Sequence, residues 1–182
     1  MLYNGLMSGF NRPNMEVKRK IFISYHHFYD QYYKDFLSNT LSEKYDICTD
    51  NSIEEPIDSD NIDYLKWKIK NEHIKGTSVT IVLCGSDTYK RKWIDWEIKY
   101  TLEMEHALIG LYLPNATRNL NGNIIVPDRL YHNIKSGYAK FAPYSTSDAI
   151  ALKALIENAI SHSKGNQNLI INNMPLKARN DS

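Results

Sequence analysis

Short apolar runs alternate along this chain with longer segments in which apolar residues recur every three or four positions. The runs are rich in β-branched and aromatic residues and predict buried strands, whereas the longer spacing is typical of amphipathic helices. Strands are expected at residues 20–25, 45–49, 78–84, 107–113 and 138–143, and helices over about residues 29–41, 58–76, 90–105 and 147–162. This alternation predicts an α/β domain with a central, mostly parallel five-stranded sheet that helices cover on both faces.

Helix ends and buried helix faces also follow from the sequence. Asp58 or Ser59 is a suitable N-cap for the second helix and Ser147 for the last, and Gly76 is expected to end the second helix. The positions expected to face the sheet are Tyr29, Tyr33, Phe36, Leu37 and Leu41 in the first helix, Ile62, Leu65, Ile69 and His73 in the second, and Ile150, Leu152, Leu155, Ile156 and Ile160 in the last.

The two ends of the chain lack this periodicity. Residues 1–17 are interpreted as a flexible N-terminal arm and residues 18–162 as the folded domain. Residues 163–182 are rich in Asn, Lys and Ser and are interpreted as a C-terminal tail, in which Ile170 and Ile171 are the residues suited to dock. Residues 115–137 are expected to be mostly irregular, and loops of this length are usually functional or mobile.

Charge and cysteine content exclude several function classes. The net charge is +1, so nothing indicates nucleic acid or an anionic membrane as a partner. Cys48 and Cys84 form no C-x-x-C pair, which argues against both a disulfide framework and a structural zinc site. The sequence shows neither a signal peptide nor an apolar run of the ~20 residues that a membrane helix needs, and a cytoplasmic protein is expected.

Ligands of parallel sheets bind beyond the carboxyl ends of the strands. The residues after the first strand include Tyr25 and His26, for which a nucleotide-facing role is favoured, and Asp30, which the dipole of the next helix favours. The adjacent histidines His26 and His27 suggest metal binding, but neighbouring side chains diverge and no cluster of ligands accompanies them. Gly85 and Ser86, after the third strand, would let a phosphate or ribose approach the backbone closely, although an ordinary strand-to-helix turn is the favoured interpretation.

The helix at residues 90–105 carries the most informative carboxylate. Arg91, Asp95 and Lys99 follow one another at intervals of four and predict a solvated stripe of alternating charge. Glu97 lies off this stripe, has no charged residue three or four positions away, and follows Trp93 by one turn. A carboxylate beside an aromatic side chain is a candidate ribose-binding group; a surface glutamate, or one paired with a distant lysine, is the alternative.

Common nucleotide-binding and hydrolase motifs are absent from the sequence. It contains no Walker A loop, no G-x-G-x-x-G and no G-x-S-x-G. A response-regulator receiver shares the alternation of strands and helices, but the third strand here ends in Cys-Gly where the phospho-acceptor aspartate would stand.

Two motifs resemble those of TIR domains. K-I-F-I-S-Y-H-H-F-Y-D at residues 20–30 resembles the opening TIR motif, and W-I-D-W-E at residues 93–97 is similar to the Trp-Cys-x-x-Glu motif, with Ile94 in place of the cysteine. The strings T-I-V-L-C-G-S-D-T-Y-K-R-K-W-I-D-W-E-I (80–98) and V-P-D-R-L-Y-H-N-I (126–134) resemble more closely the TIR-like ThsB family of the bacterial Thoeris anti-phage system. The resemblance covers residues 18–160.

This resemblance implies a flavodoxin-like, three-layer fold and an enzyme that cleaves NAD+ at the nicotinamide–ribose bond, with Glu97 as the catalytic residue. The product would be a cyclic ADP-ribose isomer that activates a partner effector of the ThsA type. NAD+ is then a substrate, no cofactor is expected, the phage trigger is unknown, and the active form is expected to be a homo-oligomer. The candidate substrate-binding residues are Ser24, Tyr25, His26, Asp50, Ser86 and Trp93, and no metal ligand is expected.

Other functions remain compatible with the sequence. A non-enzymatic TIR adaptor that acts by oligomerising would have the same fold and would not need Glu97. An enzyme similar to nucleoside deoxyribosyltransferases would use a glutamate as nucleophile on a glycosidic bond, although the Ser-Tyr opening favours a TIR domain. A nucleotide-binding module without turnover is the third alternative.

Overall fold

The computed structural model describes residues 18–48, 61–145, 148–178 and 180. Within them the strands β1 (Arg19–Ser24), β2 (Tyr45–Cys48), β3 (Val79–Cys84), β4 (Ala107–Tyr112) and β5 (Lys140–Pro143) form one sheet in the order β2-β1-β3-β4-β5. Each neighbouring pair is parallel. The α/β, flavodoxin-like fold is therefore confirmed.

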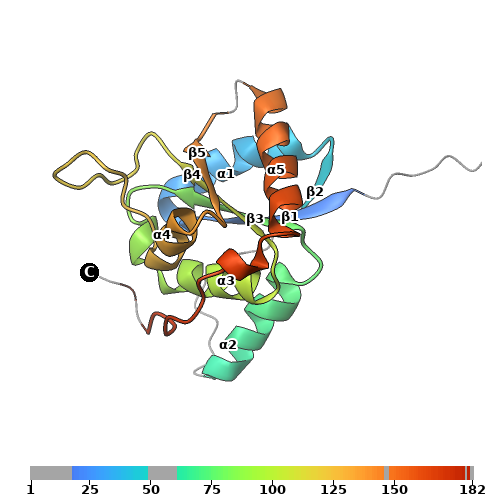
Figure 1. Ribbon diagram of the computed structural model, residues 1–182. Coiled ribbons are helices and arrows are strands. Elements are labelled where there is room, and N and C mark those ends of the chain that lie inside the picture. The colour runs from blue at the N-terminus through green and yellow to red at the C-terminus, as the bar shows by residue number, and fades with distance from the viewer. Residues whose placement is uncertain (1–17, 49–60, 146–147, 179, 181–182) are drawn as a thin grey trace, which may run out of the picture.

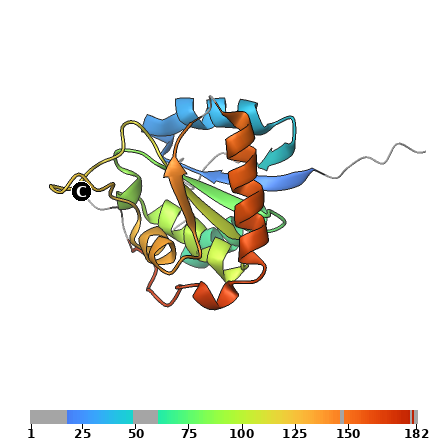
Figure 2. The ribbon, with the colours of Figure 1, turned by 45° about the horizontal axis from the view of Figure 1, so that its top comes forward.

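Helices cover both faces of this sheet and make the domain three layers deep (Figures 1 and 2). On one face lie α1 (His27–Leu41) and α5 (Ala149–Ser163). On the other lie α2 (Ile62–Lys68) with its π-helical continuation η1 (Ile69–Ile74), α3 (Lys92–Glu103) and α4 (Asp128–Lys135). Two short 3-10 turns, η2 (Thr88–Lys90) and η3 (Gln167–Leu169), complete the regular structure of the described residues.

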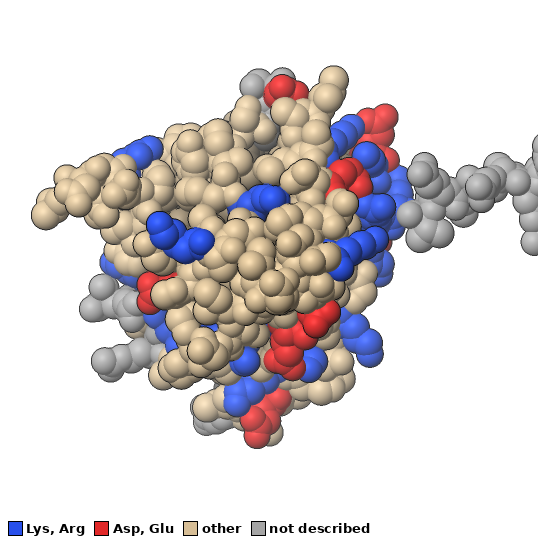
Figure 3. All heavy atoms as spheres, in the orientation of Figure 1, with Lys and Arg blue, Asp and Glu red and all other residues tan. Residues whose placement is uncertain are grey.

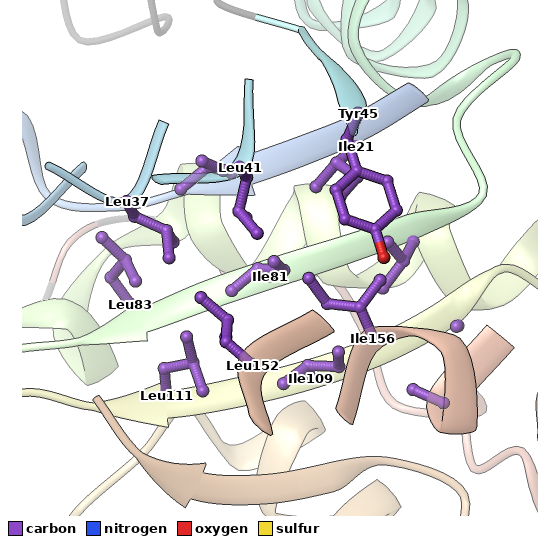
Figure 4. Close-up of a cluster of buried hydrophobic side chains, with 14 of the residues drawn as sticks. Ile21, Leu37, Leu41, Tyr45, Ile81, Leu83, Ile109, Leu111, Leu152 and Ile156 are labelled. Atoms are coloured by element: carbon purple, nitrogen blue, oxygen red, sulfur yellow. The ribbon is translucent and has the colours of Figure 1, made fainter. Parts of the chain in front are cut away.

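Side chains of each strand alternate between the two layers of core. From β1, Ile21 and Ile23 join the cluster under α1 and α5, and Figure 4 shows Ile21 there beside Leu41 and Ile156. Phe22, between them, belongs to a cluster on the opposite face. All six residues of the central strand β3 are buried because helices cover both of its faces.

The chain changes direction across the sheet between β1 and β3. The connection from β1 to β2 contains α1 and runs over one face, whereas the connection from β3 to β4 contains α3 and runs over the other. Neighbouring parallel strands whose connections diverge in this way leave a crevice at their carboxyl ends. The residues that follow β1 and β3 therefore lie where a ligand is expected.

Several predicted helix faces and caps are wrong. Tyr29, Phe36, Ile62 and Ile150 are exposed, Ile150 to 83%, because each helix meets the sheet over a narrower band than its apolar residues cover. Ile150 stands two positions before the buried Leu152, which places it on the far side of α5.

The observed N-caps are Asn61, which accepts bonds from the N–H groups of Asp63 and Tyr64, and Asp148, which accepts one from that of Ala151. The proposed caps Asp58, Ser59 and Ser147 lie outside the described residues. The chain leaves the second helix as expected at Gly76, whose φ is 84°.

The stretch 115–137 is mostly irregular, as expected, but it contains the helix α4, which the sequence did not predict. The buried residues of this helix are Arg129, Leu130 and Asn133, and two of these three are polar. A helix that buries hydrogen-bonded polar groups produces no apolar periodicity, so the sequence pattern missed it.

The C-terminal residues expected as a tail pack along α3 and α4 over much of their described length. The side chain of Asn133 donates to the carbonyl of Ile171 at 2.8 Å and accepts from its N–H at 3.0 Å. Arg129 donates to the carbonyl of Pro175 at 2.9 Å, and the indole N–H of Trp96 donates to that of Lys177 at 2.9 Å.

Asp95 is not part of a solvated stripe. It is 9% exposed and accepts a bond from the Nε of the fully buried Arg129 at 2.9 Å, while the N–H of Lys177 donates to its other oxygen at the same distance. Arg129 lies 34 positions away in the sequence, so a pattern along one helix cannot reveal this pair.

Charged side chains of both signs are mixed on the surface. On the face in Figure 3, Lys and Arg side chains are interspersed with Asp and Glu side chains. Near β2, for example, Glu157 forms ion pairs with Arg19 and Lys44. No disulfide joins Cys48 and Cys84. Within the described residues, no helix has the length and apolar character needed to cross a membrane.

Candidate active site

Glu97 and Ser24 meet at the carboxyl end of β1. The Ser24 hydroxyl donates to Oε2 of Glu97 at 2.6 Å, a length typical of a bond to a carboxylate. Ser24 is 1% exposed and Glu97 3%. Alternation along β1 turns Ser24 toward α3, as it does Phe22, and Glu97 lies on the side of α3 that faces the sheet. This burial excludes the alternative that Glu97 is a surface glutamate.

Aromatic and aliphatic side chains form one wall on this face. Buried residues of β1, α2, η1 and α3 pack together there: Phe22, Leu65, Ile69, Ile74, Trp96 and Tyr100. Trp93 packs partly buried against this cluster, with its ring 5.2 Å from that of Trp96 in an edge-to-face arrangement. The predicted aromatic neighbour of Glu97 therefore belongs to the same face of the domain.

Tyr25 lies on the other face of the sheet. Its ring belongs to the core under α1 and α5, it stacks on His27 at 4.4 Å, and its hydroxyl donates to Gln31 at 2.8 Å. Ser24 and Tyr25 are consecutive, so the alternation that turns Ser24 toward Glu97 turns Tyr25 away. The structure does not bring these two predicted site residues together.

His26 follows in the loop after β1 and is 4% exposed, with its ring 4.9 Å from that of Tyr29. Burial, together with the positive charge of Arg91, lowers the pKa of His26 to about 4. His26 is therefore neutral at pH 7 and offers one donor and one acceptor.

Gly85 makes the close approach that its sequence position suggested, but to a carboxyl group of the protein. A Cβ atom on Gly85 would overlap the side chain of Asp30, which is fully buried. Asn115 donates to Oδ1 of Asp30 at 3.2 Å and Thr88 to Oδ2 at 3.4 Å. Burial raises the pKa of Asp30, and these hydrogen bonds oppose that rise.

Hydrogen bonds also connect the loops around Asp30. The Thr88 hydroxyl accepts from the N–H of Gly85 at 2.8 Å, and the carbonyl of Ser86 accepts from the hydroxyl of Thr117. Hydrogen bonds therefore join the first turn of α1, the connection from β3 to α3 and the loop after β4 at the carboxyl edge of the sheet. In the sequence, Asp30 stood out for its favourable place near a helix N-terminus and as the last residue of the opening TIR-like motif.

Two further expectations concern Asp50 and metal binding. Asp50 lies outside the described residues, so its predicted role is unplaced. Across the described part of the chain, no group of three His, Cys, Asp or Glu residues is arranged to hold a metal ion.

His73 also belongs to the site, although the sequence did not indicate it. Its Nδ1 lies 3.9 Å from Oε1 of Glu97, and both side chains are almost fully buried. The sequence had placed it with Leu65 and Ile69 on the apolar side of the second helix. The signal available in the sequence was a polar residue, His73, on the side of the helix that faces the core.

The arrangement suits a reaction in which positive charge develops on a bound sugar. A carboxylate in a water-poor site stabilises such charge more strongly than it would in bulk water, because the local dielectric constant is lower. It can also accept hydrogen bonds from sugar hydroxyls. Ser24 and His73 leave little freedom for its orientation.

Comparison with known proteins agrees with this picture. The family model described as "Thoeris protein ThsB, TIR-like domain" matches residues 22–118, a little over half of the chain. A Bacillus cereus (strain MSX-D12) protein named "Putative cyclic ADP-D-ribose synthase ThsB1" is 39% identical over 57 residues. That match covers 31% of this chain and 29% of the relative.

The matched range begins in β1 with Phe22, contains Ser24, His73 and Glu97, and ends in the loop after β4. It therefore includes the residues at the carboxyl ends of β1 and β3. By its fold and by this match, the chain belongs to the family of TIR-like ThsB proteins of the Thoeris system.

Proposed function

We propose that this protein cleaves NAD+ at the nicotinamide–ribose bond and converts it into a cyclic ADP-ribose isomer that acts as a signal in anti-phage defence. The observation that carries the proposal is the position of Glu97. Its carboxylate is buried and accepts a hydrogen bond from Ser24 at the carboxyl end of β1, where the connections of neighbouring strands diverge in a TIR-like sheet. The name of the Bacillus cereus relative supports this product class, although the match covers 29% of that protein.

The proposed reaction needs a carboxylate more than it needs an acid. When the bond between the anomeric carbon and the pyridinium nitrogen breaks, its electron pair goes to the nitrogen and nicotinamide leaves as a neutral molecule. The ribose acquires oxocarbenium character, which the Glu97 carboxylate would stabilise as carboxylates do in glycoside hydrolysis. A hydroxyl of the adenine-side ribose then bonds to the anomeric carbon and releases its proton to solvent or to a base.

Cyclisation requires that water is kept from the anomeric carbon while that hydroxyl is held nearby. The aromatic wall that includes Trp93 and Trp96 is suited to exclude water on one side. Among the predicted substrate-binding residues, Ser24 and Trp93 share a face with Glu97, and His26 and Ser86 lie in loops at the same edge of the sheet.

Glu97 is 3% exposed, so a ribose can reach its carboxylate only after neighbouring groups move. This burial supports a resting state that must open before turnover. We therefore propose that infection supplies an unidentified trigger. We also propose that the active form is a homo-oligomer and that the reaction takes place in the cytoplasm. The product would diffuse to an effector of the ThsA type.

The test is incubation of the purified full chain with NAD+, with and without lysate from infected cells, followed by mass analysis. Glu97→Gln keeps the size of the side chain and removes its charge. Glu103→Gln is the matched control, because Glu103 lies on the same helix in a partly exposed ion pair with Lys70. Wild type and the control should release nicotinamide and form a product with the mass of cyclic ADP-ribose, and Glu97→Gln should not.

Other products would change the conclusion. Linear ADP-ribose alone would make the protein a hydrolase. No turnover in any sample, together with a Glu97→Gln variant that still protects cells from phage, would refute the enzyme and favour the adaptor.

A further inference from the structure

His73 occupies a position that the proposed chemistry has not used. It lies in η1, a six-residue π-helical turn that continues α2, and is 1% exposed. π-Helical turns are rare and often occur at functional sites, because the wider turn moves side chains out of α-helical register. Here the turn buries Ile69, His73 and Ile74 together against β1 and α3.

The two oxygens of the Glu97 carboxyl group meet different elements. Oε2 accepts the bond from Ser24 of β1, and Oε1 lies 3.9 Å from Nδ1 of His73. This separation is longer than a hydrogen bond, and such contacts in catalytic sites are often long in the absence of substrate and shorten when it binds. The rings of Phe22 and His73 lie 5.6 Å apart between centroids, in a tilted arrangement.

One contact alone would let the carboxyl group rotate about its bonded oxygen. A second contact, from η1 instead of β1, restricts that rotation. Catalytic groups have to be held to within roughly 0.5 Å and 10–20° of the productive geometry.

We propose that His73 is a positioning residue that orients the Glu97 carboxylate for cleavage of the glycosidic bond, an inference that rests on the proposed function. It acts through Glu97 and makes no contact with substrate. The π-helical turn then explains how the polar side chain of His73 comes to lie beside the apolar cluster of β1, η1 and α3.

Two substitutions of similar size separate positioning from packing. His73→Gln keeps an N–H donor for Glu97 and loses the ring, whereas His73→Phe keeps a ring against Phe22 and loses the donor. We expect His73→Phe to lower kcat for NAD+ at least tenfold with KM changed less than threefold, and His73→Gln to retain most of kcat. Circular dichroism and urea unfolding check that both variants fold.

Loss only in His73→Gln, equal loss in both variants, or no loss in either would overturn the positioning role. A spectroscopic measurement does not depend on turnover. In protein with ¹⁵N-labelled histidine, we expect Nδ1 of His73 to carry a proton in the wild type and to lose it to Nε2 in Glu97→Met. The exposed His132 serves as the unchanged reference.

Ring nitrogens of His73 that ignore the Glu97→Met change would overturn the inference even if the enzyme is active. A shift of the proton in a protein that never turns over NAD+ would leave the contact in place but refute the proposed function, and with it the positioning role. The two failures are therefore distinguishable.

Discussion

The buried pair of Asp95 and Arg129 gives the most direct test of how the C-terminal residues are held. Arg129 is fully buried and donates to both oxygens of Asp95, at 2.9 and 3.3 Å, and to the carbonyls of Met174 and Pro175. Asp95→Asn keeps the size of the side chain and removes the negative charge that compensates the guanidinium. The substitution leaves a buried cation with neutral acceptors only.

Removing one partner of a buried ion pair costs about 3–5 kcal/mol, and the remaining carbonyl acceptors favour the lower end of that range. We therefore expect Asp95→Asn to lower the free energy of unfolding by about 3 kcal/mol. In a chain of this length, 1 kcal/mol shifts Tm by about 2–4 °C, which gives a fall of about 6–12 °C. The assay is urea unfolding followed by circular dichroism, with Tm from a thermal scan.

Glu103→Gln is the control for a charge lost on the same helix. Its ion pairs with Lys70 and Lys99 are partly exposed and should contribute at most about 1 kcal/mol. A double variant, Asp95→Leu with Arg129→Met, should lose less stability than the two single changes added together, because no buried charge is then left alone. An Asp95→Asn variant as stable as Glu103→Gln would refute this account of the pair.

Two further predictions concern the loops at the carboxyl edge of the sheet. Gly85→Ala should lower the free energy of unfolding, measured in urea, by about 1–3 kcal/mol, because the new Cβ would overlap the Asp30 carboxyl group. Gly165→Ala is the control and should have no comparable effect, because the space around Gly165 is open. Equal stability of the two variants would contradict the close approach of Gly85 to Asp30. Burial holds the pKa of His26 at about 4, below the 6.5 of an unfolded histidine. Between pH 4 and pH 6.5 the folded state therefore binds fewer protons than the unfolded state, and the free energy of unfolding should rise by on the order of 1–3 kcal/mol across this range. His26→Gln should flatten this part of the stability profile, and an unchanged slope would show that His26 is not the group responsible.

Local patterns in the sequence were sufficient for the elements of the sheet. The apolar run at 78–84 predicts β3 because a strand covered on both faces needs no polar positions. The alternation of such runs with helices requires parallel pairing, which the structure has. Glu97 could be singled out for a similar reason, because a helical glutamate without charged neighbours on its own helix has to find its partners elsewhere.

Only the tertiary structure decided which partners those were. Ser24 is 73 positions from Glu97, and Arg129 is 34 positions from Asp95, so no helical or strand period connects them. The sequence pattern treated Asp95 as solvated and His73 as part of an apolar face, because periodicity records how a residue relates to its own helix and not what packs against it. The packing of α3 between the sheet, η1 and the C-terminal residues then turns one carboxyl group into a buried structural ion and the other, two residues later, into the candidate catalytic group.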